Sequence, residues 1–109
     1  MNIREVTDRT GLSKKAVYFY IKEGLIKPRR DTSSGYFVFS EADCKVLGAI
    51  RTLRSLNVPV PTIRRMIAHP TLSPYYLHHH LDNQKQQLRE LLYTTERMQQ
   101  LADTARFSR

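Results

Sequence analysis

The segment from Gly11 to Ile26 constrains the fold of this chain more than any other. Ahead of it, Ile3, Val6 and Thr10 recur at helical spacing, and the pattern stops at Gly11, a residue suited to the left-handed end of a helix. Ser13 is suited to cap a second helix, in which three large side chains share an apolar face: Val17, Tyr20 and Ile21. The sequence therefore predicts two short helices joined by a tight turn, a helix-turn-helix.

The other face of the second helix, over Ser13–Glu23, is basic and aromatic. Its lysines and a tyrosine fall three and four residues apart, a face suited to the major groove of DNA. The alternative for the lysines is a solvated helix face. Tyr20 and Ile21 are read as core rather than contact residues, and Phe19 stays open between the two. The candidate DNA contacts on this helix are Ser13, Lys14, Lys15, Tyr18, Phe19 and Lys22.

A β-hairpin is predicted after Pro28. The cluster Asp31–Gly35 is typical of a turn, and the aromatic and β-branched run Tyr36–Phe39 is typical of a short return strand. Such a hairpin is a wing beside the helix-turn-helix. Arg29 and Arg30 on its first arm are candidate DNA contacts, and Tyr36 either packs beneath the wing or reaches a phosphate through its hydroxyl.

Two further helices follow the predicted wing. Ser40, with Asp43 at the capping-box distance, begins a helix that is expected to end near Asn57, with a buried stripe of Val46, Leu47, Ile50, Leu53 and Leu56. Pro59 and Pro61 fit the start of a fourth helix, which is placed over Thr62–Ala68 and closed by Pro70. The side chains expected to point inward from it are Ile63, Met66 and Ile67.

From Ser73 onward the chain has no glycine, and apolar residues alternate at spacings of four and three, which predicts one long helix. At about 1.5 Å per residue, roughly 33 residues make a rod near 50 Å long. Its own small domain cannot cover an apolar stripe of that length, so a second copy is expected, as an antiparallel coiled coil. The predicted division is a DNA-binding domain over 1–70 and a dimerisation helix over 71–109. The dimer contacts are predicted at Leu77, Leu81, Leu88, Leu91, Met98, Ala102 and Ala105.

The charge of the chain favours a polyanionic partner. The net charge is +8, and residues 1–70 hold 13 Lys or Arg against 6 Asp or Glu, whereas residues 71–109 hold 5 against 4. Double-stranded DNA is favoured over a membrane, because no segment approaches the length of a spanning helix. No signal or transit peptide is visible, and a single cysteine excludes an intramolecular disulfide, so a cytoplasmic location is expected.

Metal and catalytic sites are not predicted. Consecutive helical residues point about 100° apart, so His78, His79 and His80 cannot converge on one ion. Cys44 has no Cys or His at ligand spacing and is expected to be a small structural residue. No nucleophile with its base, phosphate-binding glycine loop or carboxylate pair can be assembled. The sequence predicts neither a cofactor nor an enzyme.

The whole chain resembles the mercury-resistance regulator (MerR) family of bacterial transcription factors. The resemblance lies in the order and spacing of several short motifs: Gly11-Leu12-Ser13, Phe19-Tyr20, Glu23-Gly24-Leu25, Pro28-Arg29, Gly35-Tyr36, Phe39-Ser40 and Leu56-Asn57-Val58. It implies an all-α fold with a small β-hairpin wing, a winged helix-turn-helix followed by a long coiled-coil helix. It also favours the phosphate side for Tyr36, and it places at least one of Arg64 and Arg65 near the DNA backbone; Arg64 is the candidate DNA contact of the two.

Two positions depart from the family pattern, and each removes a cation that the family usually directs at DNA. Tyr18 stands where arginine is common in the recognition helix, and Phe37 stands where arginine commonly follows the Gly-Tyr pair of the wing. The contact expected at Phe37 is therefore absent or moved to Arg29 or Arg30. The absence of two phosphate contacts would flatten the salt dependence of binding by about 0.9 log units per contact, unless neighbouring lysines compensate.

The resemblance implies a homodimer that binds a pseudo-palindromic promoter operator and distorts its centre for RNA polymerase, in the cytoplasm and associated with the nucleoid. An effector domain usually follows the long helix, so the chain is expected to be a fragment of a longer regulator or a short member. The alternative is an excisionase-like or architectural protein that bends DNA without regulating transcription, although such folds usually lack the long helix. A third hypothesis is a coiled-coil interaction module in which the basic N-terminal part has no function in DNA binding. This hypothesis predicts no DNA affinity at low salt.

Overall fold

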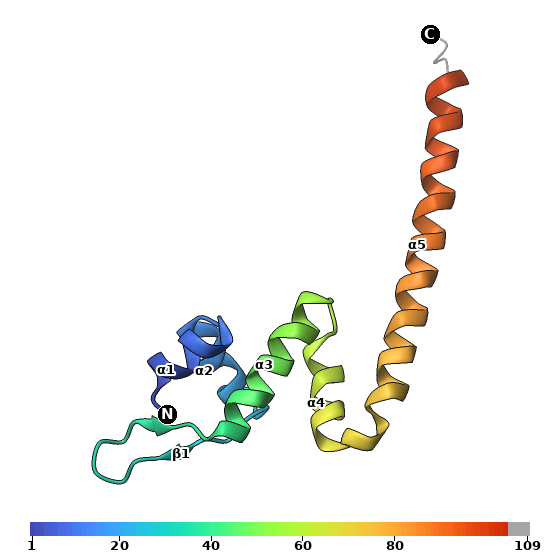
Figure 1. The fold of residues 1–109 in the computed structure, drawn as a ribbon. Helices are drawn as coiled ribbons and strands as arrows, with labels where there is room; N and C mark the ends of the chain where they lie inside the picture. Colours follow the sequence, from blue (N-terminus) through green and yellow to red (C-terminus); the bar gives the residue numbers. More distant parts are fainter. Residues whose placement is uncertain (105–109) are drawn as a thin grey trace. The chain divides into compact units, whose positions relative to one another are not determined.

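The computed structural model describes residues 1–104, which fall into two compact units divided between Pro70 and Thr71 (Figure 1). The first unit holds four α-helices and a two-stranded antiparallel sheet, and the second holds the long helix. In chain order the elements are α1 (Ile3–Thr10), α2 (Lys14–Lys22), β1 (Arg29–Arg30), β2 (Phe37–Val38), α3 (Glu41–Ser55), α4 (Val60–Ala68), a 3₁₀ turn (Pro70–Leu72) and α5 (Ser73–Thr104).

The predicted helix-turn-helix is confirmed, down to its caps. Gly11 ends α1 in the left-handed region at φ 75°, and its N–H donates to the carbonyl of Thr7 at 2.9 Å. The hydroxyl of Ser13 accepts the N–H of Ala16 at 3.0 Å, which satisfies a free donor at the start of α2. Val17 and Tyr20 are buried, whereas Ile21 is only partly buried against the core. The turn therefore fixes the direction in which α2 leaves α1.

The wing is a hairpin whose paired part is shorter than predicted. Arg29 pairs with Val38 and Arg30 with Phe37, while Tyr36 lies in the turn region and Phe39 lies beyond the paired residues. The carboxylate of Asp31 shapes the turn by accepting the N–H groups of Ser33 at 2.8 Å and Ser34 at 3.1 Å. Phe39 anchors the base of the hairpin, because its ring is buried and its N–H donates to the carbonyl of Met1 at 2.7 Å.

Helices α3 and α4 close the first unit. The capping box at Ser40 and Asp43 is confirmed in both directions, each at 3.0 Å. Two predicted core residues are wrong: Leu56 is 58% exposed and Ile67 is 38% exposed. Leu56 comes after the last residue of α3, and Asn57 then turns the chain through a left-handed φ of 62°, so the helical stripe does not continue. The fourth helix begins at Val60, two residues earlier than predicted, with Pro61 in its first turn.

One core holds the first unit together. It is formed by side chains from α1, α2, α3, α4 and the segments that join them: Val6, Val17, Tyr20, Leu25, Ile26, Phe39, Leu47, Ile50, Val58 and Ile63. Because Val17 and Tyr20 are fixed in this core, the opposite side of α2 is held outward. Taken with α5 and the small hairpin, the described residues confirm the predicted fold class.

Candidate nucleic-acid interface

The outer face of α2 is exposed along its whole length. Tyr18 is 45% exposed and Phe19 is 46% exposed, and the three lysines of the helix are exposed as well. The ring of Phe19 makes an edge contact with the buried ring of Tyr20, with 5.5 Å between centroids, so Phe19 stands partly against the core and partly in solvent. Five of the six DNA contacts predicted on this helix therefore lie on one accessible surface: Lys14, Lys15, Tyr18, Phe19 and Lys22. The sixth, Ser13, is the N-terminal cap of α2.

The positive end of α2 has two lysines and no acidic residue in its first turn. A helix N-terminus bears a partial positive charge, so Lys14 and Lys15 lie where a cation is unfavourable and an anion is favourable. Lys22, in the last turn, lies where a cation is favourable. Two lysines that add to the positive potential of a helix end form a local site suited to a phosphate.

The two arginines of β1 lie in different surroundings. The guanidinium carbon of Arg30 lies 4.1 Å from the ring centroid of Phe37, and its Nη1 donates to the carbonyl of Gly35 at 2.8 Å. Arg29 is paired across the sheet with Val38, on the opposite face of the hairpin because side chains alternate along a strand. Both arginines are exposed, but only Arg30 is held by a ring.

At the wing tip, Asp31 is the acidic residue closest to these cations in sequence. The hydroxyl of Ser33 and the N–H groups of Ser34 and Ser33 donate to its carboxylate, and they lower the pKa of Asp31 from 3.8 to about 2. The negative carboxylate of Asp31 therefore accepts hydrogen bonds within the turn and stabilises it.

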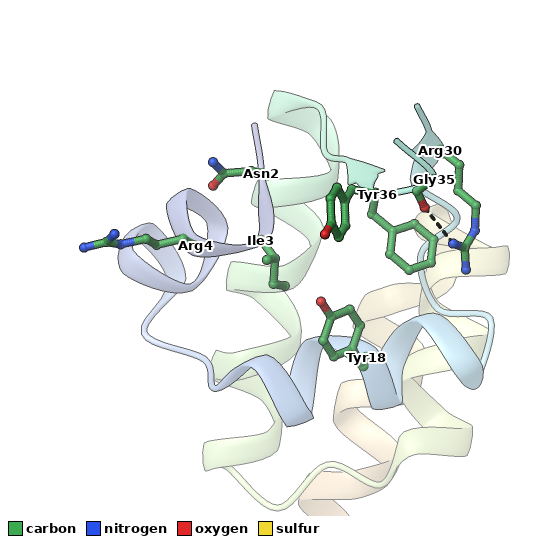
Figure 2. A pocket seen from close by; sticks show the side chains of 8 residues that line it. Asn2, Ile3, Arg4, Tyr18, Arg30, Gly35 and Tyr36 are labelled. Atoms are coloured by element: carbon green, nitrogen blue, oxygen red, sulfur yellow. Dashed lines mark hydrogen bonds between the residues drawn. The ribbon is translucent and has the colours of Figure 1, made fainter. Parts of the chain in front are cut away.

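An open cavity of about 480 Å³ lies between α2, the wing and the start of α1, and Figure 2 shows the side chains around it. Tyr18 projects from α2 toward the wing, and its ring centroid is 6.3 Å from that of Phe37. The ring of Tyr36, which is 78% exposed, has its hydroxyl end turned toward Tyr18. We call this the wing cavity, lined by Asn2, Ile3, Arg4, Tyr18, Arg30, Gly35, Tyr36 and Phe37.

The structure gives Arg64 a partner within the protein. Its Nη2 donates to the carbonyl oxygen of Glu23 at 2.9 Å and to the carboxylate Oε2 of Glu23 at 3.1 Å. Glu23 is the C-terminal cap of α2, so this contact ties α4 to the end of the candidate recognition helix. Sequence reasoning proposed Arg64 as a DNA contact and did not foresee this bond, because 41 residues separate the two partners.

On α5, the residues predicted for dimerisation are exposed in the single chain. The exposed fraction is 37% for Leu77 and 42% for Leu81, and it rises to 63% for Leu91 and 69% for Met98. Leu88 and Ala102 are exposed too, whereas Ala105 lies outside the described residues. Large apolar side chains in such a row are unusual on a solvated helix, which is consistent with a surface that a partner covers.

Residues 1–104 hold neither a metal cluster nor a membrane-spanning helix. No three side chains of the metal-ligating types gather in this range, and Cys44 is a buried free thiol. None of the helices between these bounds is long and apolar enough to cross a membrane.

Two short helices joined by a capped turn, with a hairpin wing packed beside the second helix, define the winged helix-turn-helix class. Comparison with known proteins identifies the family within this class. The pattern of the MerR HTH family regulatory proteins matches residues 1–69, and the chain belongs to that family, as its motifs predicted. The family consists of transcription regulators and not of enzymes.

The curated relatives match the first unit only. A heavy metal-dependent transcription regulator of Rhizobium meliloti is 34% identical over 68 residues, which are 62% of this chain and 46% of that protein. A probable heavy metal-dependent transcriptional regulator of Haemophilus influenzae is 38% identical over 68 residues, 62% of this chain and 53% of that protein. The chain thus spans about half the length of the curated relatives it matches.

Solved structures resemble the chain over nearly its full length. The lead(II) complex of the transcription regulator PbrR691 from Ralstonia metallidurans has a TM-score of 0.83 at 20% identity, covering 99% of this chain and 91% of that one. The regulator HiNmlR, a MerR family member lacking the sensor domain and bound to promoter DNA, has a TM-score of 0.61 at 19% identity, with 94% and 78% covered. At these identities the likeness establishes the shared fold.

Proposed function

We propose that this protein is a DNA-binding transcription regulator that acts as a homodimer on a pseudo-palindromic promoter operator. Each subunit places α2 in a major groove and rests the wing against the flanking sugar-phosphate backbone. The observation that carries this proposal is the outer face of α2, where Lys14 and Lys15 add their charge to the positive end of a helix that the core holds outward.

The proposed contacts divide by chemistry. Lys14, Lys15 and Lys22 are suited to phosphates, and Tyr18 and Phe19 offer flat surfaces to base edges and thymine methyl groups. In the wing, Arg29, Arg30 and the hydroxyl of Tyr36 are suited to the backbone. Ser13 contributes through its cap, because its hydroxyl accepts the N–H of Ala16 and its position begins the helix that enters the groove. Arg64 acts on DNA through the end of α2, to which it is bonded.

The exposed row on α5 supports dimerisation. The 32 residues of α5 extend about 48 Å at 1.5 Å per residue. A second copy paired antiparallel along this helix buries Leu77, Leu81, Leu88, Leu91 and Met98, and it fixes the distance between the two recognition helices. This long helix favours a regulator over an excisionase-like protein.

The proposed mechanism is indirect readout. Two α2 helices held at a fixed spacing bend or untwist the DNA between them, and the cost of deforming the duplex is offset by the contacts that the deformation permits. Such a distortion at a promoter changes the alignment of its elements for RNA polymerase. HiNmlR, which has a similar fold and lacks the sensor domain, is bound to promoter DNA, and this supports promoter binding by the winged helix-turn-helix and long helix that the two proteins share.

Selection of bound duplexes from a random pool, followed by fluorescence anisotropy on the recovered duplex, tests this proposal. Lys15→Ala with Tyr18→Ala should weaken binding of that duplex while the sedimentation behaviour of the protein stays unchanged. Wild-type affinity in this double variant would refute the assignment of α2, and recovery of no duplex at low salt would refute DNA binding altogether.

A further inference from the structure

The guanidinium of Arg30 is held in place by two contacts within the wing. It stacks over Phe37 at 4.1 Å from the ring centroid, and its Nη1 donates to the carbonyl of Gly35 at 2.8 Å. The contact with the ring uses none of the guanidinium's hydrogen bonds, and the bond to Gly35 uses one of its five N–H donors, so further donors are left for another partner. Within residues 1–104 no carboxylate forms an ion pair with Arg30.

Phe37 is itself fixed by neighbouring rings. Its centroid lies 6.2 Å from that of Phe39, which is 2% exposed in the core, and 6.3 Å from that of Tyr18 on α2. The register of the hairpin places Arg30 directly opposite Phe37, so both side chains stand on the same face of the wing. Arg30 therefore packs on the middle ring of a row that runs from Phe39 in the core through Phe37 to Tyr18 on α2. Figure 2 shows Arg30 and Tyr18 beside the cavity.

Arg29 provides the contrast. It pairs with Val38 and lines a different hollow at the base of the wing, together with Lys27, Phe39 and Asp43. Among the described residues the cation–π contact of the wing is made by Arg30 and not by Arg29. Ordering a free arginine side chain costs conformational entropy, and a side chain that is already ordered avoids much of this cost on binding. Arg29 and Arg30, neighbours on one short strand, thus differ in how far their side chains are ordered before they bind a partner.

We propose that Phe37 is a positioning residue that holds Arg30 for a contact with a DNA phosphate beside α2. Phe37 reaches no phosphate itself; its ring stands on the face of the wing that meets Tyr18, and it supplies the surface on which the cation of the opposite strand is ordered. The inference rests on the proposed function, in which duplex DNA lies against both α2 and the wing, and it assigns the wing's backbone contact to Arg30 rather than to Arg29.

A double-mutant cycle on the duplex recovered by selection tests this role. Phe37→Leu keeps an apolar side chain but removes the ring, and Phe37→Tyr keeps the ring; each is made in the wild-type, Arg30→Ala and Arg29→Ala backgrounds. An exposed cation–π contact corresponds to about two- to fivefold in an equilibrium constant, hence about four- to 25-fold for two wings. Phe37→Leu should lose that much affinity in the wild-type and Arg29→Ala backgrounds, and Phe37→Tyr should lose none.

The Arg30→Ala background gives the decisive comparison. There, Phe37→Leu should change affinity by less than about twofold, the usual error of additivity, because the residue through which Phe37 acts is gone. Arg30→Ala alone should lower the slope of log affinity against log salt by about 0.9 for each phosphate that Arg30 neutralises. An equal loss from Phe37→Leu in all three backgrounds would show a merely structural role and overturn the inference.

A measurement on the unmutated protein makes the test independent of how the variants fold. The NMR order parameter of the Arg30 Nε–H group should exceed that of Arg29, because only Arg30 is stacked and bonded. Equal order parameters would overturn the positioning role. If the wild-type protein binds no selected duplex, the proposed function fails; if it binds and the cycle is additive, the role of Phe37 fails alone.

Discussion

Reversing the charge at either end of α2 should change stability and DNA binding in separable ways. Lys15→Glu places an anion in the first turn of the helix, where the partial positive charge of the N-terminus favours it. Lys22→Glu makes the same change in the last turn, where the helix end is negative and an anion is unfavourable. Both residues are exposed, so the matched pair differs mainly in its position along α2.

The expected magnitudes follow from the helix dipole. One charge at an exposed helix end contributes about 0.3–1 kcal/mol, and a reversal roughly doubles this to about 0.6–2 kcal/mol. Because Lys15 is open to solvent, the lower part of that range, about 0.6–1 kcal/mol, is expected there. For a domain of this size that raises the melting temperature by about 3–8 °C. Lys22→Glu should lower the melting temperature by a comparable amount, whereas both variants should bind DNA more weakly and with a salt slope reduced by about 0.9 per phosphate.

Two measurements separate the effect on stability from the effect on DNA binding. Circular dichroism follows thermal unfolding, and fluorescence anisotropy follows the DNA titration, each at low salt and at 1 M salt. At 1 M the Debye length is about 3 Å, so the two melting temperatures should converge on that of the wild type. Equal shifts of the same sign for Lys15→Glu and Lys22→Glu would refute the dipole argument and leave only the reduced net charge of the domain. A stabilised Lys15→Glu that still binds the selected duplex with full affinity would refute the placement of α2 in the groove.

Three further results are expected. Leu88→Glu with Leu91→Glu should turn the dimer into a monomer in sedimentation velocity, and an unchanged sedimentation coefficient would exclude α5 as the dimer contact. Arg64→Ala should weaken DNA binding without changing its salt slope, because Arg64 acts through Glu23; a slope lower by about 0.9 would instead indicate a phosphate contact. The folded pKa of Asp31 is depressed, so its contribution to stability is complete above pH 3.8 and is lost as the pH falls toward 2. Its carboxyl carbon should accordingly titrate near pH 2 by NMR, and a midpoint near 3.8 would contradict the turn geometry.

Local signals in the sequence predicted most of the fold. Gly11 and Ser13 each act within a few residues of their own position, through a left-handed helix end and a hydroxyl that caps the next helix, and both are found as expected. The capping box of α3 was predictable for the same reason. The errors at Leu56 and Ile67 have different causes. Leu56 lies beyond the last residue of α3, where the helical stripe stops. Ile67 lies within α4, but helical spacing alone does not report how much of a helix its neighbours cover.

Contacts between residues far apart in the sequence could not be predicted from local sequence patterns. The bond from Arg64 to Glu23 depends on how α4 packs beside the end of α2, and no local pattern reports that packing. The stack of Arg30 on Phe37 depends on hairpin register, which the number of residues in the turn decides. Residues 31–36 contain several turn formers and allow more than one register, so the sequence left Arg29 and Arg30 equivalent.

The two departures from the family pattern are neighbours in space, and this changes what they imply for binding. In the sequence, Tyr18 and Phe37 are two independent replacements of a cation; in the structure their ring centroids lie 6.3 Å apart, and Arg30 packs on the ring of Phe37. The positive charge of the proposed interface is thereby shifted away from the middle of α2, toward its lysine-bearing ends and the edge of the wing. In the proposed complex, charge at the periphery supports salt-dependent attraction to any duplex, while the uncharged rings of Tyr18 and Phe19 on α2 meet base edges. Replacing Tyr18 with arginine should therefore raise affinity for unselected DNA more than for the selected duplex, and so reduce the discrimination between them.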